Sequence, residues 1–294
     1  MELHSHYKRR IDAQRHTVGD WTNCSVNTSL LYSYRSTVYD ADTFPAHLHY
    51  HDYYELIVLE EGDIRYVCES LVYHPKKGDI ILIPPEKFHM SAINGAKTRY
   101  CRHVFYFHPD AFDAYGCSCL VNFARDVQGG IMISLSESQK TEALRLLHVI
   151  RSELGEQTDT PEYALGLSYL LRFFYLLNGA KVDRAEPHGL PPVVIALKEY
   201  IDGNFATVST VKDVAEHFFY SREHTSRLFK KYFDISISDY IMQRKILESR
   251  RLILSGASIT DTAYAVGFNS MSAFISSFRR ATGMSPSEYK RLNL

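Results

Sequence analysis

The chain has few cysteines, and none of them are spaced as metal-binding or redox pairs usually are. Its five cysteines, Cys24, Cys68, Cys101, Cys117 and Cys119, are odd in number and include no Cys-x-x-Cys pair. This pattern argues against the disulfide framework of a small secreted protein and favours reduced thiols in the cytoplasm. Cys117 and Cys119 could form a redox pair, but cysteine is so commonly buried that we interpret them as ordinary loop and core thiols.

Long apolar segments are also absent. The best candidate, Leu165 to Leu177, contains Arg172 and is much shorter than the roughly 20 residues needed to cross a bilayer. Met1 to Arg15 has no apolar stretch, so no secretory signal is predicted there. With 45% hydrophobic and 23% charged residues, the composition is that of a globular protein without a membrane partner.

Net charge is nearly absent as well, at −1 for the whole chain, but the charges are unevenly distributed. From His188 onward there are 14 Lys and Arg against 10 Asp and Glu, a net charge of +4. The first 187 residues carry 19 against 24, a net charge of −5. A basic C-terminal part is what attraction to phosphate groups requires, so a nucleic-acid partner is not excluded.

The stretch from Ser258 to Tyr289 predicts two short helices around a tight turn. Ser258 and Asp261 form a Ser-x-x-Asp cap at the start of the first helix. Gly267 ends that helix, because glycine reaches positive φ without a Cβ clash. Ser270 can cap the second helix, whose apolar side chains recur at helical spacing. This is a helix-turn-helix, in which the second helix enters a DNA major groove.

The same pattern occurs twice in the chain. Thr210 to Ala215 anticipates Ser258 to Ala263, and Ser221 to Tyr240 matches Ser270 to Tyr289 in register. Two copies of one reading unit are hard to explain as core packing. The sequence here resembles the C-terminal DNA-binding domain of the AraC/XylS family of bacterial transcription regulators. The family signature G-F-x-x-x-x-x-F-x-x-x-F-[KR]-[KR]-x-x-G-x-[ST]-P-x-x-[YF] runs from Gly267 to Tyr289.

Three positions of the first copy depart from the family pattern. Phe219 stands where the second copy has Gly267, so we expect the first turn to adopt another geometry. Asp234 replaces the equivalent of Gly283, which is a milder change because Asp tolerates the left-handed region. Thr225 is polar where a large apolar residue is usual.

The helix after Ser221 is the stronger candidate for reading bases. At helical spacing its inward positions are Thr225, Leu228, Phe229 and Tyr232. Its outward positions are therefore Arg222, Glu223, Ser226, Arg227 and Lys230. Arg227 can make a bidentate contact to guanine, and Glu223 can accept a hydrogen bond from a cytosine amino group. A single surface charge is usually only solvated, but this set on one face favours DNA binding.

The reading helix of the second copy offers a weaker surface. Phe274 and Phe278 are expected to face inward, and the outward side chains are Ser272, Ala273 and Ser276. We expect base readout there to be weak or water-mediated, because these side chains are short and uncharged. The cations expected at phosphates, where they add affinity without sequence preference, are Lys230, Lys231, Arg279 and Arg280.

The N-terminal part alternates strand-like segments with turn signals. The strand-like runs are Ser29 to Val38, Glu55 to Glu60, Ile64 to Cys68, Asp79 to Ile83 and Arg99 to Phe107. Short strands at this spacing predict a closed or sandwiched β-barrel.

Beyond Ser134 the apolar period changes from 2 to 3.6, which predicts helices at Ser136 to Leu154 and at Pro161 to Asn178. One side of the first is expected to carry Leu144, Leu147, His148 and Leu154. The second helix has more apolar side chains than one face can hold. Burial against the barrel and a dimer seam are both open interpretations of this excess.

Histidines gather in the N-terminal part. His49, His51 and Glu55 are spaced to share one face of a strand, and His89 is expected to return from another strand. This resembles both cupin motifs, and sensor domains of the AraC type are cupin-like barrels. The second motif departs from its pattern at Glu86, where a glycine is expected.

Two ligand classes suit these groups. Three imidazoles and a carboxylate would suit a divalent transition metal, bound by His49, His51, Glu55 and His89. The same groups could hydrogen-bond a sugar-like effector, and the predicted effector site is Phe44, His49, His51, Tyr54, Glu55, Tyr66 and His89. Because sensors of this family generally bind effectors without metal, the resemblance favours an effector and no cofactor. Core histidines without any ligand are a third interpretation.

We therefore predict an α+β chain of two domains. Residues 1–180 form a cupin-like, effector-sensing β-barrel with trailing dimerisation helices, and residues 181–192, rich in Pro and Gly, form a linker. Residues 193–294 form an all-α DNA-binding domain with two helix-turn-helix motifs joined by a long helix, Ser238 to Ser255. If they are held about one DNA turn apart, roughly 34 Å, two reading helices can enter successive major grooves.

The resemblance implies a cytoplasmic homodimeric transcription regulator and not an enzyme. Its partners would be double-stranded promoter DNA, RNA polymerase and an activating small molecule of carbohydrate type. The alternative is a metal-dependent cupin enzyme, an isomerase or a dioxygenase, with an accessory DNA-binding domain. A regulator without any effector, controlled only by its abundance, is the third interpretation.

Overall fold

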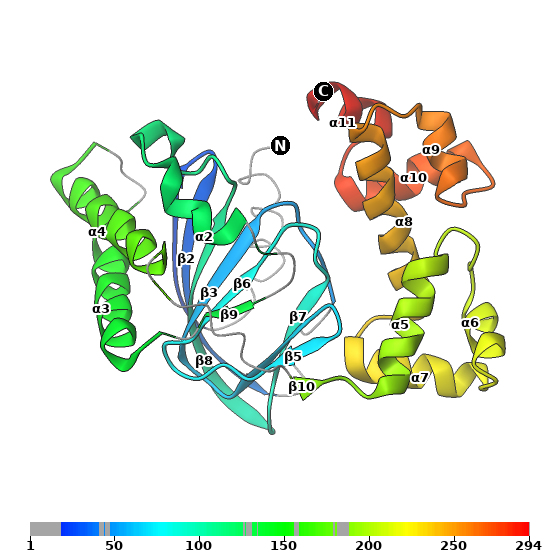
Figure 1. Ribbon diagram of the computed structural model, residues 1–294, viewed down its shortest axis with the longest axis horizontal. Helices are drawn as coiled ribbons and strands as arrows, with labels where there is room; N and C mark the ends of the chain where they lie inside the picture. The colour runs from blue at the N-terminus through cyan, green and yellow to red at the C-terminus, as the bar shows by residue number, and fades with distance from the viewer. Residues whose placement is uncertain are drawn as a thin grey trace. The chain divides into compact units, whose positions relative to one another are not determined.

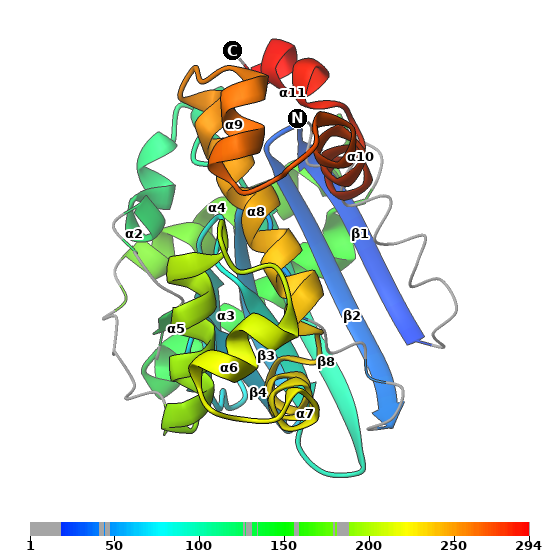
Figure 2. The same ribbon diagram turned by 90° about the vertical axis from the view of Figure 1, so that its right-hand side faces the viewer.

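A computed structural model describes residues 19–40, 44, 48–125, 127, 131–133, 135–155, 159–178, 180 and 188–293. These residues form two compact units, one ending at His188 and the other beginning at Gly189 (Figures 1 and 2). Each unit is described by itself below. Residues 1–18 and residues 181–187 of the predicted linker lie outside the described residues.

The N-terminal unit is built on two β-sheets. A six-stranded sheet has the order β1-β2-β8-β3-β6-β9, and a four-stranded sheet has the order β10-β5-β4-β7. The strands are β1 (Gly19–Asn27), β2 (Leu30–Asp40), β3 (Tyr54–Glu61), β4 (Ile64–Cys68), β5 (Leu71–Tyr73), β6 (Ile80–Ile83), β7 (His89–Ile93), β8 (Lys97–Phe107), β9 (Ile131–Ile133) and β10 (His188–Gly189). All five strand-like runs predicted from the sequence are strands.

The side chains of β8 alternate between two hydrophobic cores, as the pleat of a strand requires. Tyr100, Val104 and Tyr106 belong to the core between the two sheets. Phe105 and Phe107 belong to the core between the six-stranded sheet and the helices. The described part of the unit is therefore a sandwich of two sheets with helices on one outer face (Figure 1). No pairing among the described strands closes the sheets into one barrel.

Three helices cover that outer face: α2 (Asn122–Arg125), α3 (Glu137–Glu153) and α4 (Pro161–Asn178). The two long ones begin and end within one residue of the predicted positions. Ser136 caps α3 with a reciprocal capping box to Gln139. Of the side predicted for α3, Leu147 and Leu154 are buried and Leu144 packs against the same core, which also contains Ala143, Leu146 and Ile150. His148 instead lies outside this core, with its side chain 62% exposed.

His148 links α3 to the six-stranded sheet through Glu60 of β3. Its Nε2 lies 3.2 Å from one carboxylate oxygen of Glu60, and Nε2 of the buried His103 lies 3.4 Å from the other. His103, and then His148, outweigh the effect of burial and lower the pKa of Glu60 to about 2. Glu60 is therefore charged at neutral pH.

Glu60→Gln is expected to flatten the acid limb of the pH–stability curve. The folded-state pKa of Glu60, about 2, lies below the value of about 4.3 for an unfolded chain. Its stabilising contribution is thus present above about pH 4 and is lost as the pH falls toward 2. Urea unfolding at a series of pH values measures this, with exposed Glu61→Gln as control. Identical pH profiles for the two variants would contradict the assignment.

The C-terminal unit is entirely helical apart from its first residue. Its helices are α5 (Pro192–Asn204), α6 (Val211–His217), α7 (Arg222–Phe233), α8 (Ile237–Leu254), α9 (Ile259–Ala265), α10 (Met271–Thr282) and α11 (Pro286–Asn293). The two helix-turn-helix pairs and the long helix between them, α6 to α10, were expected from the caps and the apolar spacing. One core, around Ile246 and Ile253 of α8, includes Ala263 of α9 and both Phe274 and Phe278 of α10.

Candidate functional site

The first helix-turn-helix consists of α6 and α7. Thr210 caps α6 through a capping box with Asp213, and Ser221 caps α7 by accepting a hydrogen bond from the backbone N–H of His224. Ala215 of α6 is 2% exposed, so it is the small inward residue expected where two helices cross. The sequence pattern therefore correctly located both starts and the contact between them.

The outward face of α7 is the one expected from the sequence. The predicted base-contacting and phosphate-contacting residues of this helix are all exposed: Arg222, Glu223, Ser226, Arg227, Lys230 and Lys231. The inward face differs slightly, because Phe233 is buried with Thr225 and Phe229, whereas Leu228 and Tyr232 are only partly buried. Thr225 fits its apolar position because its hydroxyl donates to the Ser221 carbonyl at 3.0 Å.

The turn between α6 and α7 corrects one expectation. Phe219 has φ +57°, in the left-handed region, and so matches Gly267 at φ +78° in the second copy. The first turn therefore uses the same geometry and not another one. Its side chain is 95% exposed, so the strain of this conformation is not combined with a packing clash. Asp234, at φ +50°, adopts the left-handed conformation expected of it.

The second helix-turn-helix consists of α9 and α10. Ser258 accepts a hydrogen bond from the backbone N–H of Asp261 at 3.0 Å, and Ser270 caps α10. Phe274 and Phe278 are fully buried. The outward residues predicted for this copy are all exposed: Ser272, Ala273, Ser276, Arg279 and Arg280.

The long helix α8 connects the two copies, which lie near its opposite ends (Figure 1). Its 18 residues span about 27 Å at the usual rise per residue. A buried contact also ties the second turn to this helix, because Lys245 of α8 donates to the Gly267 carbonyl at 2.9 Å. Lys245 is 5% exposed, and this burial lowers the pKa of its amine. The two reading helices, α7 and α10, thus share one rigid support.

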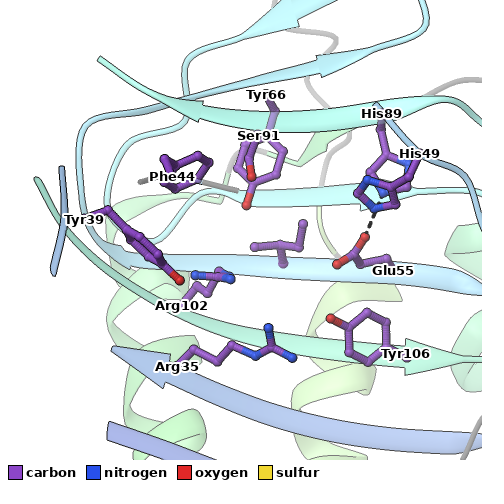
Figure 3. A pocket seen from close by; sticks show the side chains of 11 residues that line it. Arg35, Tyr39, Phe44, His49, Glu55, Tyr66, His89, Ser91, Arg102 and Tyr106 are labelled. Atoms are coloured by element: carbon purple, nitrogen blue, oxygen red, sulfur yellow. Dashed lines mark hydrogen bonds and ion pairs between the residues drawn. The ribbon is translucent and has the colours of Figure 1, made fainter. Parts of the chain in front are cut away.

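A separate cavity opens between the two sheets of the N-terminal unit (Figure 3). Glu55 and Ile57 of β3, Arg35 and Tyr39 of β2, and Arg102 and Tyr106 of β8 line it from the larger sheet. The other lining residues are Phe44, His49, Tyr66, His89 and Ser91. It therefore contains an aromatic part, two arginines and a cluster of imidazoles around one carboxylate.

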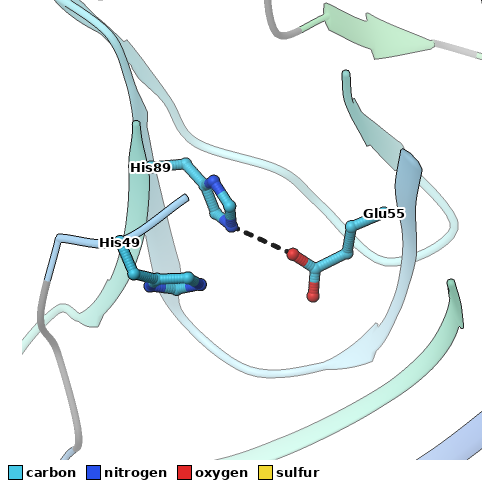
Figure 4. Close-up of side chains that lie close together, drawn as sticks. All are labelled: His49, Glu55 and His89. Carbon is cyan, nitrogen blue, oxygen red and sulfur yellow. Dashed lines mark hydrogen bonds and ion pairs between the residues drawn. The ribbon is translucent and has the colours of Figure 1, made fainter. Parts of the chain in front are cut away.

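The imidazole cluster is centred on one oxygen of Glu55. His51 Nε2 lies 3.1 Å and His89 Nε2 lies 3.0 Å from the same carboxylate oxygen. His49 joins His89 through an isolated β-bridge, and their rings are 4.2 Å apart (Figure 4). Burial acts to raise the pKa of Glu55, but the hydrogen bonds from His51 and His89 hold it well below its usual range.

The other nitrogen of each ring is committed to the backbone. His51 Nδ1 lies 2.8 Å from the Tyr53 carbonyl, and His89 Nδ1 lies 2.8 Å from the Lys87 carbonyl. A carbonyl can only accept, so both Nδ1 atoms carry the proton. Each Nε2 atom therefore faces the carboxylate in one of two states. It carries a second N–H, in which case the imidazole is charged, or it presents a lone pair, in which case a cation is needed between Nε2 and the carboxylate oxygen. The residues therefore fit a metal as well as a proton.

The cavity includes five of the seven predicted effector-binding residues: Phe44, His49, Glu55, Tyr66 and His89. His51 lies behind Glu55 as its hydrogen-bond partner. Tyr54 is a correction, because neighbours on a strand face opposite ways and Tyr54 stacks on Phe107 in the helix-side core. His49 and His51 also precede β3 and do not lie on a strand, although both rings still approach His89.

The sequence interpretation missed the two arginines of the cavity. Arg35 and Arg102 both lie within strands that were predicted, and a charged residue at an inward strand position was the available signal. Strand register was not predicted, so nothing placed them opposite one another or beside Glu55.

No helix in the described part of the chain is long and apolar enough to span a membrane.

Two family models match the chain and account for both units. Residues 33–172 match an AraC-like ligand binding domain, and residues 214–292 match a helix-turn-helix domain. The chain belongs to the AraC family of transcription regulators. It is accordingly a DNA-binding regulator with an effector-binding domain, and not an enzyme.

Relatives in this family extend over most of the chain. The HTH-type transcriptional activator RhaS of Citrobacter koseri is 24% identical over 251 residues, which are 83% of this chain and 87% of RhaS. The HTH-type transcriptional regulator YijO of Escherichia coli is 35% identical over 98 residues, 33% of this chain and 34% of YijO. Among solved structures, the C-terminal domain of AraT, a response regulator from Geobacillus stearothermophilus, is 29% identical with a TM-score of 0.34. The match covers 35% of this chain and 87% of that domain.

Proposed function

We propose that this AraC-family chain is a cytoplasmic, homodimeric regulator whose N-terminal cavity binds a small molecule that activates it. The observation that carries this proposal is the pairing of an enclosed polar cavity in one unit with two exposed reading helices in the other. On promoter DNA, α7 supplies the stronger base contacts through Arg227 and Glu223, and α10 supplies weaker ones. RNA polymerase is the further partner of such a regulator.

The proposed mechanism is a population shift. Effector binding favours the arrangement of the two DNA-binding domains of a dimer that fits the operator. By linkage, effector and operator strengthen each other's binding by the same factor. Full-length protein, a labelled operator and a set of candidate carbohydrates test this directly. The proposal fails if a saturating ligand leaves both operator affinity and transcription from that operator unchanged.

A carbohydrate is the proposed effector class. His49, Glu55, His89 and Ser91 supply donors and acceptors for hydroxyl groups, and Phe44 and Tyr66 supply aromatic surface for a sugar ring. The two facing sheets around the cavity support a cupin-like architecture for the whole unit.

The dimer seam is proposed to lie on α4. Its buried face, which includes Leu170, Phe173 and Phe174, packs against the six-stranded sheet. On the opposite face Leu165 is 47% exposed and Tyr175 is 73% exposed. Both earlier interpretations of the apolar excess can therefore hold, since one face is buried in the unit and the other is available to a second copy.

The double variant Leu165→Asp, Tyr175→Asp is expected to be monomeric. Two charges in an apolar seam would lose their hydration on association, which opposes dimer formation. Sedimentation velocity of the full chain measures the result, and Lys212→Asp on exposed α6 is a control for added negative charge. A dimer of unchanged affinity in the double variant would place the seam elsewhere.

A metal in the cavity is the second candidate, and the convergence of two Nε2 atoms on Glu55 favours it. Oxygen and nitrogen ligand atoms of His49, Glu55 and His89 all lie within 4.8 Å of one another. Such a set would hold a divalent transition metal, which would supply Lewis-acid chemistry to a bound ligand. His51 and His89 are oriented for this role by the backbone carbonyls that receive their Nδ1 protons.

Protein purified without chelator is expected to contain far less than one metal ion per chain. The family resemblance favours effector binding through charged imidazoles, which satisfy the same geometry without a metal. Elemental analysis by mass spectrometry checks this, and His49→Ala is the matched variant. Stoichiometric Mn, Fe, Ni or Zn that is lost in His49→Ala would establish the second candidate instead.

A further inference from the structure

Two arginines face each other across neighbouring strands in the cavity. In the β2–β8 ladder Arg35 pairs with Arg102, and Tyr34 pairs with His103 on the opposite face. Arg35 and Arg102 both line the cavity between the sheets, and Figure 3 shows both side chains extending into it. The register of β2 on β8 therefore brings two guanidinium groups into one enclosed space.

This arrangement is unfavourable for the protein by itself. Like charges directly opposite on adjacent strands destabilise a sheet, and burial removes the water that would screen them. Arg35 is 6% exposed, although its Nε donates to the Ser33 hydroxyl at 3.3 Å. A residue pair that weakens the fold and lines a cavity indicates a functional requirement.

Arg102 is incompletely satisfied by its surroundings. Its Nη1 atom is buried and has no hydrogen-bond partner among the described residues. The guanidinium lies 4.0 Å over the ring of Tyr100, a contact that does not supply an acceptor for the Nη1 protons. A buried N–H without an acceptor destabilises the protein, so an acceptor from a ligand would be strongly favoured.

Cationic side chains outnumber acidic ones among the described residues that line this cavity. Glu55 is the one acidic side chain among them, and its Oε2 receives both His51 and His89. Two guanidinium groups thus share the cavity with one described carboxylate, which imidazoles already hold. This excess of cationic groups favours an anion over a neutral sugar.

We propose that the effector is an anionic carbohydrate whose acidic group is held between Arg35 and Arg102. A guanidinium group can donate two parallel hydrogen bonds to two oxygens of a carboxylate or phosphate. Two arginines in one cavity can therefore hold a single acidic group between them. The hydroxyl groups of the ligand face His49, His89 and Ser91, and its carbon skeleton lies against Phe44 and Tyr39. This inference rests on the proposed function, because it specifies the ligand of the same cavity.

The dimensions of the cavity favour a compact ligand. Its volume is about 70 Å³, below the 300–1,000 Å³ of typical ligand pockets. Three-carbon acids are therefore the size that this volume favours, and an acidic sugar ring would fit only if the cavity widened. The same limit excludes oligosaccharides from the cavity in this conformation.

The test compares neutral and anionic ligands of equal size with the full chain. One series is glycerol, D-glycerate and glycerol 3-phosphate, and the other is D-galactose, D-galacturonate and D-galactose 6-phosphate. Binding is measured by calorimetry and by the shift in Tm at constant ionic strength. In at least one series we expect an anion to bind ten- to a hundredfold more tightly than its neutral partner. Comparison of the carboxylate ligand with the phosphate ligand in each series shows which acidic group the cavity binds.

Variants show whether the arginines are responsible. Arg102→Met keeps the length of the side chain and removes a buried charge, so the fold is retained while the anion loses ten- to a hundredfold in affinity. Arg99→Met, at an exposed position of the same strand, is the control and leaves affinity unchanged. The inference is overturned if no anion exceeds its neutral partner or if Arg102→Met binds the anion normally. Operator binding is measured on the same preparations with and without each ligand. If a neutral sugar raises operator affinity and no anion does, this inference fails and the proposed function stands; if no ligand changes operator affinity or transcription, the proposed function itself fails.

Discussion

Gly267→Ala is expected to unfold the second helix-turn-helix and to remove specific operator binding. A Cβ atom at this position would lie 1.8 Å from the carbonyl oxygen of Ala206, and the backbone φ is +78°. No side-chain rotamer can relieve that overlap, because the position of a Cβ is fixed by the backbone and the Ala206 oxygen is itself a backbone atom. The left-handed conformation and the clash together should cost about 3 kcal/mol or more of unfolding free energy.

Gly256→Ala separates the clash from the conformational strain. Gly256 has φ +97°, but a Cβ there would have no atom within 4 Å. Its substitution should therefore cost only the strain of the left-handed region, about 1–2 kcal/mol. Urea unfolding and operator binding of both variants measure the difference. Equal losses would mean that Ala206 moves away freely and that the turn is not held against it.

Arg227→Ala is expected to lose far more sequence discrimination than Ser276→Ala. Both residues lie at exposed positions of their reading helices. A bidentate arginine–guanine contact contributes about 1–3 kcal/mol of discrimination, whereas a serine contributes a single adaptable hydrogen bond. The ratio of affinities for the operator and for a scrambled duplex should therefore fall about five- to a hundredfold in Arg227→Ala.

Lys230→Ala provides the contrast for that experiment. A phosphate contact adds affinity without sequence preference, so this variant should weaken binding to both duplexes alike. The slope of log affinity against log salt concentration should fall by the amount expected for about one phosphate contact. The assignment of Arg227 to base reading fails if Arg227→Ala weakens binding equally on matched and scrambled DNA.

The helical unit was predictable because its signals are local. A serine or threonine cap, a helix of fixed period and a glycine after it determine α9, its turn and the start of α10 from residues close together in the sequence. The errors there were the exact inward face of α7 and the turn at Phe219. Phe219 adopts a positive φ of +57° against the intrinsic preference of a large side chain, so its residue type did not indicate the geometry.

The cavity was only partly predictable because it depends on pairing between distant strands. The spacing of His49, Glu55 and His89 was enough to predict that they come together. The register of Arg35 against Arg102 joins residues 67 positions apart, and no local pattern determines it. The prediction for Tyr54 failed for a local reason, because Tyr54 directly precedes Glu55 on β3 and neighbouring side chains of a strand face opposite ways.

Selection of bound sequences from a random duplex pool by the full-length chain tests the central claim most directly. Two reading helices on one α8 predict an enriched motif with two clusters of conserved bases about 10–10.5 base pairs apart. One cluster should be stronger, and Arg227→Ala should weaken that cluster while leaving the other. A single cluster, or no enrichment over the starting pool, would contradict a regulator that reads DNA through both copies.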